Sequence, residues 1–192
     1  MSNNTWRETL INAQADGTAL TNSTTPTSLL PAHARLALPS GFFSVIGKAL
    51  NIRARGRIST VVTTPGTLTL AVNLGTIASP IIVFSGGAMN LNTTAQTNAT
   101  WEFEAELTAR AIGSGTSANL MGIGRFQSRA LIGSPALASG YPGAALLPDT
   151  AAAVGTGFDS TVTNIVDLFG TWSVASSSNS IQVHQFSVES IN

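Results

Sequence analysis

The stretch KALNIRARGRIST, residues 48–60, decides the fold, because apolar and polar side chains alternate along it. Continued to residue 62, one face of this stretch holds Leu50, Ile52, Ala54, Ile58 and Val62. The other face holds Asn51, Arg53, Arg55, Arg57 and Ser59. A period of two residues is the pattern of a β-strand with one face in a core and the other in solvent. The sequence therefore predicts an amphipathic strand with three arginines in a row on its outer face.

The alternation continues along most of the chain. After a turn at Pro65-Gly66, residues 67–74 again alternate, which predicts that 50–62 and 67–74 form an antiparallel hairpin. In 101–111, the apolar set is Trp101, Phe103, Ala105, Leu107, Ala109 and Ala111. The outward set is Glu102, Glu104, Glu106, Thr108 and Arg110. A GSGTS turn follows, and 119–132 is predicted to return as the partner strand.

The two ends of the chain and one long loop complete the pattern. Residues 160–175 and 181–191 predict a closing hairpin, in which Val162, Val166, Leu168, Trp172 and Val174 share the first strand's apolar face. The apolar phase slips in the second strand, so we expect a β-bulge near His184-Gln185. Residues 133–158 are rich in Gly, Ala and Pro and predict a long loop. Residues 1–16 predict an N-terminal arm, docked on its own domain or on a neighbour.

These elements add up to one domain, residues 17–192, preceded by the arm. Prolines and glycines break residues 17–47 into short extended pieces, which excludes long helices there. We count about eight strands and no interior helix. Such a series predicts an all-β fold: a single antiparallel β-sandwich, with the jelly roll as the best match.

The composition restricts the function. Charged residues make up 9% of the chain, against about 25% in typical domains. Because few charges leave little repulsion between copies, we expect a chain that is packed against others. Nine basic residues balance nine acidic ones, which argues against a general nucleic-acid binder. The chain has no cysteine, no signal-peptide pattern and no apolar run of membrane-spanning length, so we expect no membrane partner.

Four stretches of the chain carry a family resemblance. They are ADGTALTNSTTPTSLLP (15–31), IGKALNIRARGRISTVVTTPGTLTL (46–70), AIGSGTSANLMGIGRF (111–126) and NSIQVHQFSVESIN (179–192). Together they resemble a family of small virion proteins of tailed bacteriophages. The resemblance implies a jelly-roll structural protein of the particle, of the kind called minor capsid, head decoration, head fibre or minor tail protein. Similar viral jelly rolls commonly form trimers, so the resemblance also implies a homotrimer.

Few residues offer chemistry. His33 lies in a proline-rich segment, where a surface or loop histidine is far commoner than a catalytic base. His184 lies in the expected bulge, where a strand histidine with its hydrogen bonds satisfied is far commoner than a base. Three aspartates in or near the long loop lack the spacing of a calcium-binding loop: Asp149, Asp159 and Asp167. We therefore expect no enzyme activity, no cofactor and no metal site.

Two rows of like charge remain to be explained. They are Arg53, Arg55 and Arg57 on one strand, and Glu102, Glu104 and Glu106 on another. Neighbours within a row stand about 7 Å apart and repel one another. One hypothesis is that both rows are solvated and unrelated, since exposed pairs contribute only about 0–1 kcal/mol. The other, which we favour because the rest of the surface is nearly uncharged, is that the rows pair as a ladder, within one sheet or across a subunit boundary.

The leading hypothesis for function is a trimeric decoration (cement) protein on the outside of a phage capsid. Its partners would be itself and the major capsid protein, and no nucleic acid. Trp6, Leu10 and Ile11 of the arm are the residues that we expect to contact neighbouring subunits or the capsid. The alternative is a minor tail or head-fibre protein that binds a host receptor or surface glycan. In that case Tyr141, in the long loop, is the first candidate for a glycan contact.

Overall fold

The computed structural model describes residues 6–133, 143–148, 150–151 and 153–191. These residues form fourteen β-strands and one short 3-10 turn, Ala32–Ala34. The strands are β1 (Arg7–Asn12), β2 (Leu20–Thr21), β3 (Thr27–Ser28), β4 (Leu36–Leu38), β5 (Ala49–Thr60), β6 (Thr67–Gly75), β7 (Pro80–Ser85), β8 (Met89–Leu91), β9 (Gln96–Ala111), β10 (Asn119–Ser128), β11 (Leu131–Gly133), β12 (Ala144–Leu147), β13 (Asn164–Trp172) and β14 (Ser180–Ile191). The sequence predicted about eight strands; eight of the fourteen have six or more residues, and one of these, β1, lies in the segment expected to be an arm.

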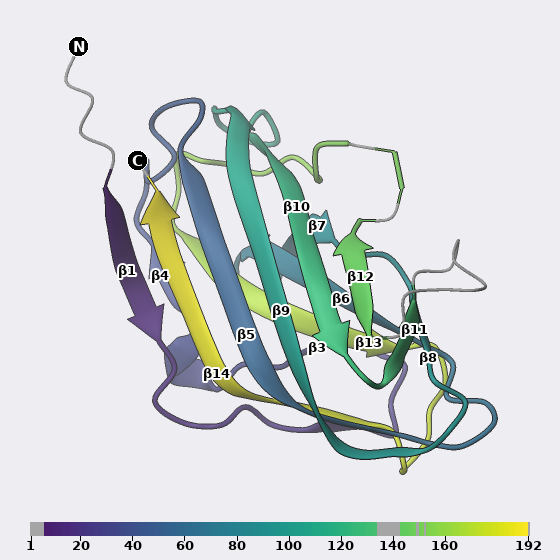
Figure 1. Cartoon of the computed structure of the whole chain (residues 1–192). Coiled ribbons are helices and arrows are strands. Elements are labelled where there is room, and N and C mark those ends of the chain that lie inside the picture. Colours follow the sequence, from purple (N-terminus) through teal and green to yellow (C-terminus); the bar gives the residue numbers. More distant parts are fainter. Residues whose placement is uncertain (1–5, 134–142, 149, 152, 192) are drawn as a thin grey trace.

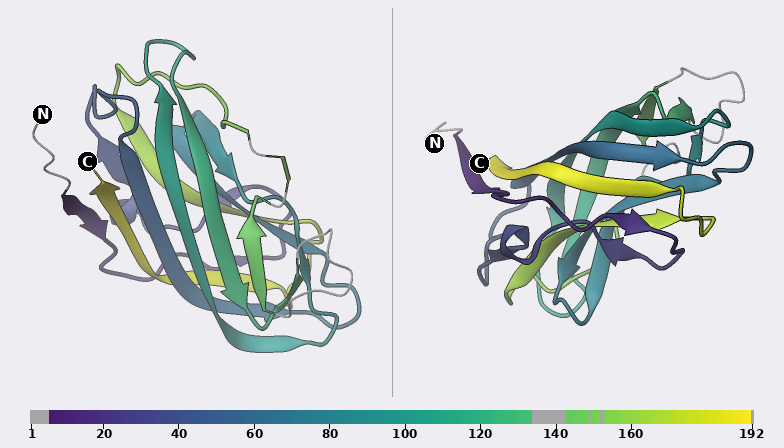
Figure 2. Two further views of the ribbon diagram at one scale, coloured as in Figure 1. Left: turned by 45° about the horizontal axis from the view of Figure 1, so that its top comes forward. Right: turned by 90° about the horizontal axis from the view of Figure 1, so that it is seen from below.

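The strands form two antiparallel sheets that pack face to face (Figures 1 and 2). The first sheet has the order β1-β14-β5-β9-β10-β12, with β2 attached to β14. The second has the order β11-β8-β6-β13-β3, with β4 attached to β13 and β7 to β6. Because alternate side chains of each strand point between the sheets, one hydrophobic core fills the space there. The all-β sandwich predicted from the sequence is confirmed.

The strands pair in the nested manner of a jelly roll. Strand β5 pairs with β14, and β6 pairs with β13. Closer to the middle of the sequence, β8 pairs with β11, and β9 pairs with β10. The chain therefore folds back on itself as a long double strand that wraps around the core, which is the topology that defines a jelly roll.

Two of the three predicted hairpins are wrong. Strands β9 and β10 pair as expected, but β5 and β6 lie in different sheets, as do β13 and β14. Residues 61–66 and 173–179 therefore carry the chain across the sandwich from one sheet to the other. An alternating pattern shows which side chains point inward, but it is the same for a strand in either sheet, so it could not distinguish a hairpin from such a crossing.

The predicted apolar faces are buried except at four positions at or beyond strand ends, one of which, Ala111, is half-buried. The residues named for β5 and β9 are buried, from Leu50 to Ile58 and from Trp101 to Ala109. Val62, Val162 and Val174 are instead exposed, because they lie beyond the ends of their strands. Large side chains from both sheets fill the interior, among them Trp101, Phe103, Phe126 and Trp172, and Phe158 adds to them from the connection before β13.

The N-terminal segment is docked on its own domain. Strand β1 pairs with β14 at the edge of the first sheet (Figure 1). Leu10 and Ile11 are half-buried against the core of the same chain, whereas Trp6 is 56% exposed. Of the three arm residues expected to contact a neighbour, only Trp6 therefore leaves most of its side chain on the surface.

Both histidines hold the segment that follows β1. His33 Nε2 accepts a hydrogen bond from the backbone N–H of Gln14 at 3.2 Å. His184 Nδ1 lies 2.9 Å from a carboxylate oxygen of Asp16. The register between β14 and β5 shifts between Val183 and Gln185, which confirms the bulge predicted at His184-Gln185. The two imidazoles thus contact the segment that joins β1 to β2.

The region expected to be one long loop contains a strand. Residues 144–147 form β12, which pairs with β10 and extends the first sheet. Val154 and Phe158 then form isolated bridges to Met121 and Ala118. Tyr141 lies outside the described residues. In the part of the chain that the structure describes, no helix is long and apolar enough to cross a membrane.

Candidate functional site

The two rows of like charge lie side by side on the outer face of the first sheet. Strands β5 and β9 are adjacent and antiparallel, with Arg53 opposite Glu104 and Arg55 opposite Glu102. Side chains at paired positions of neighbouring strands point to the same face. The rows therefore face each other within one subunit, one of the two arrangements that the sequence left open.

Glu104 is the centre of this ladder. Arg53 Nε donates to its Oε1 at 2.9 Å, and Asn51 Nδ2 donates to the same oxygen at 3.2 Å. From β10, on the other side of β9, Arg125 Nη2 lies 3.0 Å from Oε2. A second rung joins Arg55 Nη2 to Glu102 Oε1 at 3.0 Å. The ladder thus spans three strands and fixes their side chains relative to one another.

The two rows are offset, so one residue of each lies outside the ladder. Arg57 faces Thr100 and donates to its hydroxyl and to the carbonyl of Asn98. Glu106 faces Asn51, and it has neither an ion pair nor a hydrogen bond with any residue that the structure describes. The offset follows from the pairing register, which alternation within one strand does not specify.

The contacts of Glu104 shift its titration. The hydrogen bond from Arg53 is the largest cause that lowers the pKa of the Glu104 carboxyl, and the hydrogen bond from Asn51 and the charges of Arg53 and Arg125 act in the same direction. Partial burial opposes them without cancelling them. The ladder therefore favours the charged form of Glu104 in the folded protein.

This shift leads to a prediction about acid stability. Because the pKa of Glu104 is lower in the folded state, its contribution is complete above the ordinary glutamate pKa and is lost as the pH falls through the lowered value. We expect Glu104→Gln to be less stable than the wild type at neutral pH, by a margin that shrinks in acid. Urea unfolding at a series of pH values between about 7 and 3 measures that margin.

Glu8→Gln is the control, because Glu8 is exposed on β1 and has no ion pair or hydrogen bond with a residue that the structure describes. Its urea midpoint at pH 7 should match that of the wild type. If the difference in unfolding free energy between the wild type and Glu104→Gln stays constant from neutral to acid pH, the ladder does not lower the pKa of Glu104.

The aspartates singled out in the sequence have structural roles. Asp167 lies in β13 and is buried. Its Oδ1 accepts hydrogen bonds from Ser28 Oγ at 2.6 Å and from the Leu168 N–H at 2.8 Å. Its Oδ2 lies 3.2 Å from Arg35 Nε. Burial is the largest influence on its carboxyl and raises the pKa. Asp159 binds the backbone N–H groups of Gly115 and Thr161.

Asp149 lies outside the described residues. Among the residues that are described, no three His, Asp or Glu side chains gather in a way that could hold a metal ion.

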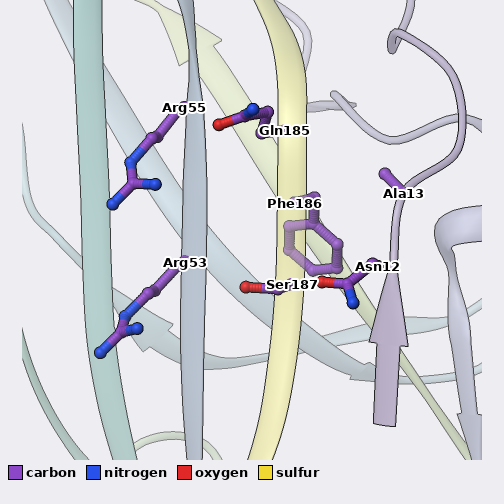
Figure 3. A pocket seen from close by; sticks show the side chains of 7 residues that line it. All are labelled: Asn12, Ala13, Arg53, Arg55, Gln185, Phe186 and Ser187. Carbon is purple, nitrogen blue, oxygen red and sulfur yellow. The ribbon is translucent and has the colours of Figure 1, made fainter. Parts of the chain in front are cut away.

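A polar groove runs beside the ladder on the same face. Gln185 and Ser187 of β14 lie between the arginines of β5, Arg53 and Arg55, and the end of β1 (Figure 3). Asn12 and Ala13 form the other wall. The groove offers hydroxyl, amide and guanidinium groups at a shallow, open surface. Its residues come from three strands that are distant in the sequence, so nothing in the sequence pattern indicated it.

An apolar patch lies on the other side of the ladder, and the sequence analysis missed it. We call Ile123, Leu146 and Val154 the edge patch; their exposed fractions are 64%, 77% and 48%. Leu146 pairs with Arg125, which faces outward, and Val154 forms a bridge with Met121. The three side chains therefore lie on one face. Ile123 occupies an outward position of the β10 pattern and was recognisable, whereas Leu146 was hidden in the supposed loop.

No protein-family model matches the sequence, and no curated protein matches it either. Three solved structures with some likeness are the CBM2 module of the evolved Dit of Lactobacillus casei BL23 phage J-1, the winged bean acidic lectin complexed with methyl-α-D-galactose, and an endo-1,3-β-glucanase from Streptomyces sioyaensis.

Their sequence identities to this chain are 10%, 9% and 10%, and their TM-scores are 0.37, 0.36 and 0.28. The match with the phage module covers 98% of this chain and 97% of the module. The match with the lectin covers 98% of this chain and 99% of the lectin, and the match with the glucanase covers 86% of this chain and 74% of the glucanase. TM-scores and identities this low establish neither a family nor a function for this chain.

Proposed function

We propose that this chain is a non-enzymatic structural protein of a bacteriophage particle, a trimeric decoration protein on the outer capsid lattice. The observation that carries the proposal is the nature of the surface. Only 9% of the residues are charged, while large apolar side chains such as Ile46, Ile77, Ile123 and Leu146 are each more than 60% exposed. Exposed apolar side chains among few charges favour burial against other proteins.

The internal use of the charges supports the same proposal. Most charged side chains that the structure describes are held by other groups of the same chain, as in the ladder around Glu104. A rigid sandwich with a neutral, low-charge surface suits a protein that adds mechanical cohesion to a lattice. The resemblance of the four sequence stretches to small phage virion proteins is the reason for choosing a phage particle.

The test is the number of copies in purified particles of the encoding phage. Quantitative mass spectrometry against the major capsid protein should give a count comparable with that protein. A count of a few per particle would move the chain to the tail or to a single vertex. Its absence from washed particles would contradict a virion role.

The polar groove of Figure 3 favours a second candidate function, the binding of a host surface glycan. Planar amides and hydroxyls such as those of Asn12, Gln185 and Ser187 are groups that bind sugar hydroxyls in proteins. If this function holds, a glycan array should give a signal that Gln185→Ala abolishes. Gln127→Ala, an exposed glutamine on β10 outside this groove, should keep the signal.

A further inference from the structure

The edge patch adjoins a hollow that contains an unpartnered carboxylate. Residues of β5, β9, β10 and β12 line this hollow: Asn51, Glu104, Glu106, Ile123, Gly124, Arg125 and Leu146. Ile123 and Leu146 provide its apolar part. Arg53 and Arg125 pair with Glu104, whereas Glu106 has no ion pair or hydrogen bond with a residue in the described part of the chain.

Unpartnered charges are rare in this protein. Among the charged residues that the structure describes, only Glu8, Glu106 and Arg110 have no ion pair, hydrogen bond or aromatic contact. Glu106 and Arg110 are two of these three, and they lie on the same face of β9, four residues or about 13 Å apart. One acid thus lies beside the edge patch and one base lies farther along the same strand, both without a partner among the described residues.

We propose that this face is the contact between copies of the chain, in which Arg110 of one copy enters the hollow of the next. The aliphatic part of the arginine packs on Ile123 and Leu146, and its guanidinium pairs with Glu106. An arginine suits such a hollow because its stem is apolar while its end forms charge-assisted hydrogen bonds with a carboxylate. This inference rests on the self-association in the proposed function and adds the residues that carry it.

The arrangement also explains why the occupant is a second copy. A side chain that fits the hollow has an apolar stem to pack on Ile123 and Leu146 and a positive charge to pair with Glu106. Arg110 is such a side chain; it lies on the same face of β9 and has no partner among the described residues. Each copy then offers one hollow and one arginine. A closed assembly of copies, such as a two-fold pair or a three-membered ring, then uses every hollow and every arginine once.

Charge exchange tests the contact in the purified protein. Analytical ultracentrifugation should show that Glu106→Arg and Arg110→Glu each weaken association about tenfold or more, since each places like charges together. The double variant Glu106→Arg/Arg110→Glu should restore association, because the pair is reformed in the opposite sense. Glu8→Arg changes the third unpartnered charge, which lies on β1, and should have no effect.

The apolar part of the contact has its own matched pair of variants. Leu146→Ser should weaken association about tenfold or more, because it removes a leucine from the interface. Ile77→Ser removes an apolar side chain of similar exposure beside the second sheet and should leave association unchanged. Thermal unfolding of each variant separates loss of association from loss of folding.

The outcomes distinguish this contact from the proposed virion role. A wild-type chain that sediments as a monomer up to its solubility limit would overturn the contact, as would single and double variants that all associate like the wild type. If the wild type is monomeric and Leu146→Ser abolishes its binding to phage heads, the hollow receives the capsid protein instead of a second copy. If the charge variants weaken and restore association as expected, but the protein is absent from phage particles, the contact between copies is supported and the virion role is contradicted.

Discussion

Gly56→Ala should lower the free energy of unfolding by about 3 kcal/mol or more, because there is no room for a methyl group at this position. Gly56 lies in β5, between β14 and β9. A Cβ atom there would overlap the backbone carbonyl oxygen of Gln182 and would lie 3.0 Å from Trp101 Nε1. The carbonyl belongs to the neighbouring strand and cannot move without breaking the β5–β14 pairing. Urea unfolding followed by tryptophan fluorescence measures the loss.

Arg57→Ala is the control for this substitution. Arg57 is the next residue of the same strand, but its side chain is exposed and points away from the core. Its removal should change stability by less than about 1 kcal/mol. A Gly56→Ala protein with the urea midpoint of the wild type would show that β14 can move away from β5 at low cost.

Asn179→Ala should lower the free energy of unfolding by about 2–4 kcal/mol, the second largest effect that we expect. Asn179 is completely buried, and its side chain joins the two connections between the sheets. Its Oδ1 accepts from the N–H of Val61 at 2.9 Å, and its Nδ2 donates to the carbonyl of Pro65 at 3.0 Å. Alanine would leave both backbone groups without their partner.

Ser177, in the same connection, provides the control for Asn179→Ala. Ser177 is exposed, and Ser177→Ala should leave the unfolding midpoint unchanged within measurement error. If Asn179→Ala were equally neutral, water would replace the amide, and the two connections would not depend on each other. Thermal and urea unfolding together test whether the loss persists across conditions.

The strands and their buried faces were predictable because alternation is a local signal. Residues 50–60 and 101–109 point inward and outward as the sequence indicates. The ends of strands were harder to predict. Val62 continues the alternating pattern of β5, but the pairing of β5 with β9 stops at Thr60. Beyond it, the N–H of Val61 donates a hydrogen bond to the side chain of Asn179. That contact joins positions 118 residues apart, which no local pattern contains.

The candidate sites show the same division between local and distant information. The two charged rows were recognisable as outward positions, but their offset depends on the β5–β9 register, so Arg57 and Glu106 could not be assigned. The hollow combines Asn51, Ile123 and Leu146 from three separate strands. These strands come together only in the fold; Ile123 was recognisable as an outward position, whereas Leu146 lay in the region expected to be a loop.

The position of β14 has a consequence for how the protein is made. This strand lies between β1 and β5, so the first and fifth strands of the chain can join one sheet only after residues 180–191 have left the ribosome (Figure 1). Until then β5 presents an open edge, and the N-terminal strand has no partner. Pairing between such distant segments slows folding, and an open edge during synthesis promotes aggregation. We therefore expect the yield of native protein to depend on chaperones and on low temperature during expression.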